Sequence, residues 1–204
     1  MNNIKAIIFD LGGVLLDIDY NKTKRAFEDI GVSDFHKMYS QADANPLFQD
    51  LETGKIEEDE FYRKIKIHVG DHISKEMIEK AWNAMLLDFR KQSLKELKTL
   101  RKKYKLYLLS NTNYIHLKAF NKIYKNTVGD VPFADLFDKV YYSHELGLRK
   151  PDVAPFEYVI KENNLIPNQT LFIDDTLKNV EGAEKAGLQV IHFTHGMKVE
   201  NLGL

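Results

Sequence analysis

Short apolar runs rich in β-branched residues recur along the chain, and most are separated by helix-like patterns. The runs lie at residues 4–9, 105–109, 140–142, 170–173 and 189–193. Helical patterns occupy residues 91–103, 113–125, 153–164 and 176–186. Buried strands that alternate with helices are typical of βαβ units. We therefore expect an α/β core with a doubly wound, parallel, Rossmann-like sheet.

Residues 18–88 interrupt this alternation. Their apolar residues recur at helical spacing, as in Ile56, Phe61 and Ile65, and Gly or Pro residues break the pattern at intervals. We interpret this stretch as a small all-helical cap domain inserted after the first strand. The core would then comprise residues 1–17 and 89–204, and the cap residues 18–88.

Composition narrows the class of protein. The chain has 204 residues, 44% hydrophobic and 29% charged, which suits a soluble protein with a buried core. A net charge of −1 creates no field that would attract nucleic acid or an acidic membrane. Cysteine is absent, which excludes disulfides and thiolate catalysis. No apolar run approaches the ~20 residues of a membrane span, and the first residues lack a signal-peptide layout. We expect a cytoplasmic protein, monomeric by default.

Polar residues stand where four of the predicted strands end. Because the carboxyl ends of parallel strands share one edge of the sheet, where ligands bind, these side chains should converge there. Lys150 lies in a Gly- and Pro-flanked loop that should reach the same edge. The strand-end residues are Asp10, Ser110-Asn111, Ser143 and Asp174-Asp175.

The acidic members of this set indicate a metal site. Asp10, Asp174 and Asp175 would repel one another unless a hard cation neutralised them. Oxygen ligands suggest Mg²⁺, and the backbone carbonyl of Gly12 could supply a further ligand.

The remaining members indicate an anion site. Lys150 and the Ser110 hydroxyl would bind an anion together with backbone N–H groups around Leu11 and Asn111. A cation site, an anion site and a lone strand-end carboxylate together suggest phosphoryl transfer. Asp10 would attack phosphorus, and water would hydrolyse the resulting aspartyl-phosphate.

Four motifs, in this order along the chain, resemble the haloacid dehalogenase superfamily of phosphohydrolases: "FDLGGV", "LLSNT", "GLRKPD" and "FIDDTLKN". The resemblance covers essentially the whole chain. The most similar branch is that of capped bacterial sugar-1-phosphate phosphatases, such as those acting on glucose 1-phosphate.

The resemblance implies roles for individual residues. Asp10 would be the nucleophile, and Ser110 and Lys150 would bind the phosphoryl group. Asp175 would ligate Mg²⁺ directly, and Asp174 would do so directly or through a water. Asn179 would orient this acidic pair, and the helical insert would close over the site.

One position departs from the family pattern. Most family phosphatases carry a general acid and base two residues after the nucleophile, where this chain has Gly12, and such a group contributes ~10²–10⁴-fold to rate. The substrate could have a good leaving group, or Asp17 or Asp19 could replace the acid. Alternatively, hydrolysis is slow or the site only binds.

We therefore expect a Mg²⁺-dependent phosphomonoester hydrolase that acts on a small phosphorylated metabolite, such as a sugar phosphate. The alternatives are a sugar phosphomutase, a haloacid dehalogenase on the same scaffold, or a non-catalytic phosphate-binding module. Within the cap, Phe48 and Glu52 are candidates to face the site and select the substrate.

Overall fold

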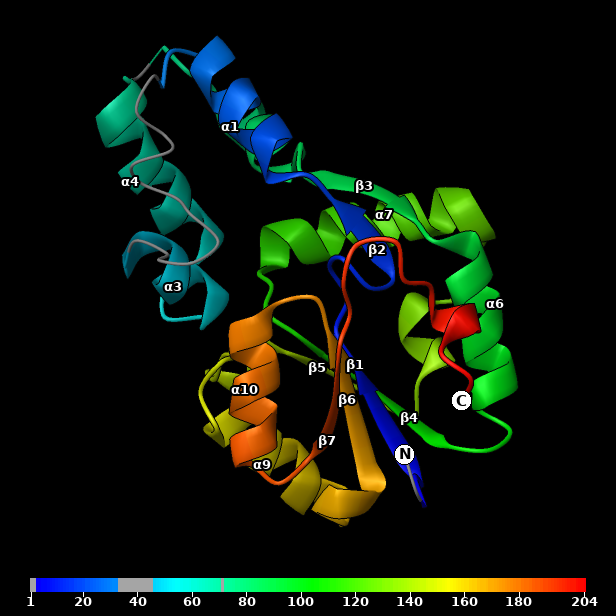
Figure 1. The fold of residues 1–204 in the computed structure, drawn as a ribbon. Helices are drawn as coiled ribbons and strands as arrows, with labels where there is room; N and C mark the ends of the chain where they lie inside the picture. The colour runs from blue at the N-terminus through cyan, green and yellow to red at the C-terminus, as the bar shows by residue number, and fades with distance from the viewer. Residues whose placement is uncertain (1–2, 33–45, 71) are drawn as a thin grey trace.

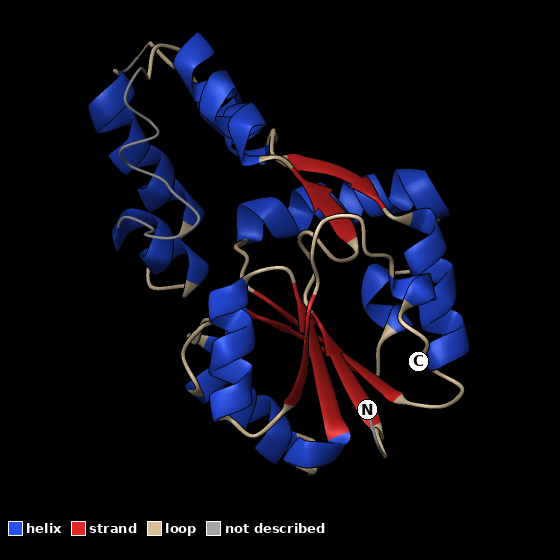
Figure 2. Cartoon of the chain, in the orientation of Figure 1, coloured by secondary structure: helices blue, strands red, loops and turns tan. Residues whose placement is uncertain are grey.

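A parallel sheet of five strands forms the centre of the α/β core in the computed structural model (Figures 1 and 2). The structure describes residues 3–32, 46–70 and 72–204. The strand order is β5-β4-β1-β6-β7, and every neighbouring pair is parallel. The strands are β1 (Ala6–Phe9), β4 (Lys105–Ser110), β5 (Lys139–Tyr142), β6 (Thr170–Asp174) and β7 (Gln189–His192). The predicted α/β class with a parallel Rossmann-like sheet is confirmed.

Helices follow the strands as the sequence predicts. The described helices of the core are α6 (Lys91–Leu100), α7 (Tyr114–Val128), α8 (Ser143–Leu146), α9 (Ala154–Glu162) and α10 (Leu177–Lys185). Short 3₁₀ turns lie at Phe133–Leu136, Pro167–Gln169 and Val199–Asn201.

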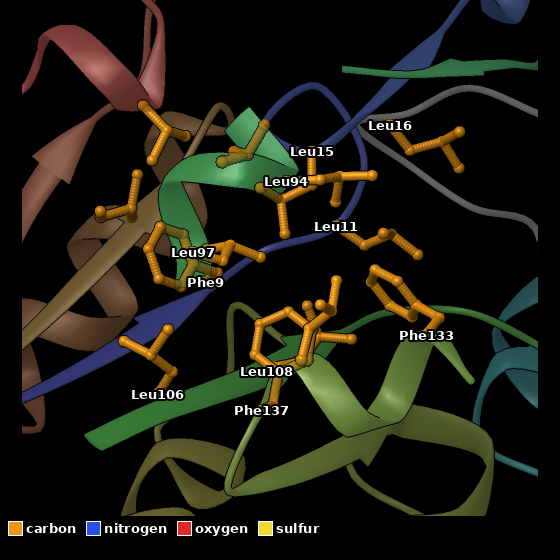
Figure 3. Close-up of a cluster of buried hydrophobic side chains, with 14 of the residues drawn as sticks. Phe9, Leu11, Leu15, Leu16, Leu94, Leu97, Leu106, Leu108, Phe133 and Phe137 are labelled. Carbon is orange, nitrogen blue, oxygen red and sulfur yellow. The ribbon is translucent and has the colours of Figure 1, made fainter. Parts of the chain in front are cut away.

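Alternate residues of the central strand build two separate cores. Ile7 and Phe9 of β1 point to the face covered by α6 and α7, where they join Leu94, Leu97 and other buried residues (Figure 3). Ala6 and Ile8 point to the opposite face, which α9 and α10 cover. All four side chains are almost fully buried, so the first strand is fixed between two apolar layers. This packing holds the end of β1 rigidly at one edge of the sheet.

A second group of helices lies beyond that edge (Figure 1). Its described helices are α1 (Tyr20–Asp29), α3 (Pro46–Glu52), α4 (Glu58–Val69) and α5 (Lys75–Asn83). Phe27, Phe48, Phe61 and Trp82 form its apolar centre. We call these four helices the helical cap.

The connections to the helical cap form a small antiparallel sheet, which is not expected from the sequence. Strand β2 (Leu16–Ile18) pairs with β3 (Leu86–Phe89). The expectation of an entirely helical stretch over residues 18–88 was therefore wrong at its two ends. Runs of three and four residues are too short to show a period that separates strand from helix.

No helix in the described ranges combines the length and apolar character needed to cross a membrane.

Candidate active site

Lys150 joins two carboxylates at the C-terminal edge of the parallel sheet. Its Nζ lies 2.6 Å from Oδ1 of Asp10 and 2.7 Å from Oδ2 of Asp174. Asp10 directly follows β1, and Asp174 is the last residue of β6, its pairing neighbour. The exposed fractions of the Lys150 and Asp174 side chains are only 1% and 0%. The topology thus brings together three charged groups from distant parts of the chain, as predicted.

Asp175 completes an acidic cluster with Asp10 and Asp174, whose carboxylate oxygens lie within 4.8 Å of one another. Burial raises the pKa of Asp10; Lys150 opposes that rise, and the charges of Asp174 and Asp175 add to it. Burial, and then the charge of Asp174, also raise the pKa of Asp175. Burial alone would lower the pKa of Lys150, but Asp10 and Asp174 raise it, so the ammonium stays charged. One ammonium cannot neutralise three carboxylates, and the donor set therefore fits a hard divalent cation such as Mg²⁺.

Hydrogen bonds fix the orientation of Asp174. The Thr176 backbone N–H donates to its Oδ1 at 2.8 Å. The Asn179 side-chain amide donates to both carboxylate oxygens, at 3.1 and 3.0 Å. Asn179 thus makes the contact expected of a residue that orients the acidic pair.

Gly12 and Gly13, which follow Asp10 closely, are each explained by a different structural constraint. Gly13 adopts a φ of +71°, and a Cβ there would lie 2.1 Å from Oδ2 of Asp175. Only glycine lets the chain turn so close to that carboxylate. A Cβ on Gly12 would instead lie 3.2 Å from Cγ1 of Ile18. Gly12 lines the cavity, and no hydrogen bond to its carbonyl oxygen is found within the described ranges.

The predicted anion-binding residues lie at the same edge. Asp10, Leu11, Ser110, Asn111 and Lys150 all line one cavity of about 220 Å³. The Asn111 side chain, however, holds the loop of Lys150. Its amide donates to the Lys150 carbonyl at 2.8 Å, and its Oδ1 accepts from the Lys150 N–H at 3.0 Å.

Ser143, the remaining strand-end residue, braces the neighbouring loop. Its hydroxyl donates to the Thr112 carbonyl at 3.0 Å and accepts from the Thr112 N–H at 2.9 Å. The serine is buried, so it supports the site from behind.

The two aspartates considered as replacement acids have structural partners. Asp17 forms an ion pair of 2.7 Å with Arg90, and Asp19 caps α1 by accepting from the Asn21 N–H at 3.0 Å. Neither of them lines the cavity. The structure therefore gives no support to either as the missing acid.

Of the two cap residues expected to face the site, only Glu52 does so. Phe48 is fully buried and stacks on Trp82 with ring centroids 5.1 Å apart, so the expectation that it faces the site was wrong. The Phe48 ring lies in the apolar centre of the helical cap. Glu52, at the end of α3, lines the cavity as expected.

Several further cavity residues were not anticipated from the sequence, notably Tyr20, His116 and Arg149. Arg149 could have been found, since it immediately precedes Lys150 in the loop "GLRKPD". Tyr20 and His116 carry no local motif. Burial lowers the pKa of His116 to about 3, so its imidazole is neutral at physiological pH.

The fold and the carboxylate–lysine cluster define an α/β protein with its site at the C-terminal edge of the sheet. The chain belongs to the haloacid dehalogenase-like hydrolase family, whose model matches residues 4–187.

Individual relatives agree with this assignment over nearly the whole chain. A D-ribitol-5-phosphate phosphatase of Bacteroides thetaiotaomicron is 34% identical and aligns with 95% of this chain and 93% of its own. The crystal structure of a mutant HAD family enzyme from the same organism, in complex with magnesium and inorganic phosphate, has a TM-score of 0.92 and 32% identity. That match covers 98% of each chain. A predicted HAD-like hydrolase of Porphyromonas gingivalis has a TM-score of 0.86 and 32% identity, over 96% of this chain and 93% of its own.

Proposed function

We propose that this protein is a Mg²⁺-dependent phosphomonoester hydrolase that acts on a small phosphorylated sugar or sugar alcohol. The observation that carries the proposal is the cluster of Asp10, Asp174 and Asp175 beside a small cavity, with the Lys150 ammonium bound to the first two. The relatives that bind magnesium and phosphate, or hydrolyse ribitol 5-phosphate, support both the metal and the substrate class.

Each side chain has a defined role in this proposal. The Asp10 carboxylate attacks phosphorus and forms an aspartyl-phosphate, while the bond from phosphorus to the leaving-group oxygen breaks and that oxygen takes a proton from water. Lys150 and the Ser110 hydroxyl, with the backbone around Leu11 and Asn111, bind the phosphoryl oxygens. Water then attacks phosphorus, the bond between phosphorus and the Asp10 oxygen breaks, and inorganic phosphate leaves as the carboxylate is regenerated.

The metal site is part of the same proposal. Asp10, Asp174 and Asp175 hold Mg²⁺, with the Gly12 carbonyl as a further ligand. When bound, the ion neutralises the carboxylates and the developing charge on the phosphoryl group. Asn179 keeps Asp174 oriented for this task.

The proposal also divides the chain into a cap domain of residues 18–88 and a core of residues 1–17 and 89–204, and the helical cap encloses the leaving group. A cavity of about 220 Å³ is smaller than the ~300–1,000 Å³ typical of sites for drug-sized ligands. It therefore favours a free small metabolite over a phosphorylated macromolecule. We also propose that the protein is a monomer that acts in the cytoplasm and has no nucleic-acid or membrane partner.

Gly12 supports one rival function, a non-catalytic phosphate-binding module. The other rivals have less support. A metal-free dehalogenase would place an anionic substrate against Asp174 and Asp175 without a neutralising cation. A phosphomutase must protonate and deprotonate hydroxyls in turn, and position 12 offers no acid for this purpose.

The test is steady-state phosphate release from D-ribitol 5-phosphate, sugar phosphates and p-nitrophenyl phosphate, with Mg²⁺ or with EDTA. Release by the wild type that needs the metal and is lost in Asp10→Asn supports the phosphatase. Retained turnover in that variant refutes Asp10 as nucleophile. Absence of release from every ester, with Mg²⁺ still bound, would favour the binding module.

A further inference from the structure

An ion pair between the helical cap and the core forms part of the cavity wall. Glu52 is the last residue of α3, and Arg149 immediately precedes Lys150. The Arg149 Nε and Nη2 atoms lie 3.1 and 3.0 Å from Oε2 of Glu52. The exposed fractions of the two side chains are 24% for Arg149 and 12% for Glu52. A pair this well covered costs desolvation energy, and its position on the cavity wall suggests a ligand-directed role.

The pair leaves hydrogen-bonding capacity unused. Both Arg149 nitrogens converge on Oε2, and no hydrogen bond to Oε1 of Glu52 is found in the part of the chain that the structure describes. An ionised carboxylate oxygen accepts hydrogen bonds from hydroxyl groups, and the other guanidinium N–H groups can donate to them. Burial raises the pKa of Glu52 above its ordinary value, and the charge of Arg149 and its hydrogen bond offset only part of this rise.

Tight packing fixes Glu52 relative to the core. Two residues later, Gly54 adopts a φ of +64°, and a Cβ there would lie 2.2 Å from the carbonyl oxygen of His144. Figure 1 shows α3 at the end of the helical cap that is nearest to the core. A carboxylate held this way is preorganised, so it loses little side-chain entropy when a ligand binds.

The rest of the wall outside the acidic cluster and Lys150 is poor in charge. Leu16, Ile18, Met85, Leu86 and Phe120 supply apolar surface. Lys178 is the other charged residue on the wall. Tyr20, Thr112 and His116 add uncharged polar groups to the wall, so the charged partners that a leaving group's hydroxyls meet outside the acidic cluster and Lys150 are Glu52, Arg149 and Lys178.

We propose that the Glu52–Arg149 pair binds hydroxyl groups of the leaving group and makes the enzyme selective for polyhydroxylated phosphate esters. This inference rests on the proposed phosphatase function and adds the residues that choose among its substrates. Glu52 and Arg149 are specificity residues in this scheme, and the bond-breaking chemistry remains with Asp10.

The experiment compares kcat/KM for D-ribitol 5-phosphate and p-nitrophenyl phosphate, whose leaving group carries no further hydroxyl. The readout is the ratio of the two values, which we call the selectivity ratio. Glu52→Gln should lower this ratio by about 10- to 100-fold, mainly through KM for the polyol ester, because it removes hydrogen bonds to a charged group. Arg149→Lys, which keeps the charge but loses the two-donor fork, should lower it in the same direction.

Glu58→Gln is the matched control. It breaks another ion pair between the helical cap and the core, with Lys118 at 2.7 Å, and Glu58 does not line the cavity. The selectivity ratio should stay within about twofold of the wild type in this variant, since surface pairs contribute little. A thermal melt of each variant establishes that it is folded.

The outcomes separate the two proposals. If Glu52→Gln and Arg149→Lys reduce kcat/KM for both esters by the same factor, the pair merely holds the helical cap, and the inference is overturned. If the wild type hydrolyses both esters with Mg²⁺ but does not prefer the polyol, the inference fails and the proposed function stands. If neither of these two esters nor any other ester of the panel releases phosphate with Mg²⁺, both proposals are overturned.

Discussion

Replacing Lys150 with methionine isolates the electrostatic role of the ammonium. Methionine preserves much of the length and apolar character of the side chain but removes the ammonium nitrogen, which lies 5.3 Å from the centroid of the Phe172 ring. The change removes the bonds of 2.6 and 2.7 Å to Asp10 and Asp174 and leaves the acidic cluster without its internal cation.

The burial of Lys150 determines how much folding stability the substitution should cost. Removing one partner of a buried ion pair costs ~3–5 kcal/mol because the remaining charge is left unpaired. With 1% of the Lys150 side chain exposed, solvent cannot replace the lost partner, so we expect a loss in this range at pH 8 without Mg²⁺. At pH 5 the loss should be smaller, because the already raised pKa of Asp10 rises further and the carboxyl takes up a proton.

Urea denaturation at pH 5 and pH 8, with EDTA or with Mg²⁺, measures these differences. Mg²⁺ should restore part of the lost stability, by ~2.7 kcal/mol at a concentration 100 times its Kd. The matched control is Lys118→Met, which breaks the exposed pair with Glu58 and should cost ~0–1 kcal/mol. An equal loss for Lys150→Met at both pH values, or a loss no greater than that of the control, would refute the reasoning.

Three further variants test the same site. In EDTA, Asp10→Asn should be more stable than the wild type at pH 8, by urea denaturation. The raised pKa of Asp10 means that wild-type stability falls as pH rises, a fall that the variant lacks. Gly13→Ala should lower the melting temperature and weaken Mg²⁺ binding by calorimetry, since its Cβ would displace Asp175. Gly12→Asp combined with Ile18→Ala should raise kcat on poor leaving groups relative to Ile18→Ala alone, up to ~10²-fold; no gain would show that position 12 lacks the geometry for proton transfer.

The sheet could be predicted because parallel strands are buried on both faces. Such strands have near-continuous apolar sequences, as in β1, β4 and β6, and each ends where a polar residue interrupts the run. The small β2–β3 sheet has no comparable signal. Apart from the buried Leu16 and Phe89, its residues are partly buried or exposed, and its pairing joins segments about 70 residues apart, a relationship that local periodicity does not encode.

The convergence of Asp10, Asp174 and Lys150 follows from topology alone, which is why the sequence predicts it. The contact between Glu52 and Arg149, in contrast, could not be predicted from the order of the strands. Arg149 lies 97 residues further along the chain, and the two meet only because the helical cap packs its α3 end against the core. Likewise, nothing in the motif "LLSNT" indicates that the Asn111 amide holds the Lys150 backbone.

The glycine at position 12 is best understood together with its neighbour Ile18. Gly12 does not adopt a left-handed conformation, so the backbone itself would accept a side chain there. The space beyond it, however, contains the apolar side chain of Ile18, 3.2 Å from the position of a Cβ. A carboxylate placed against this surface would be poorly solvated and would need the isoleucine to move. An acid at position 12 therefore needs Ile18 of β2 to shift by a few tenths of an ångström, which is why Gly12→Asp is best tested together with Ile18→Ala.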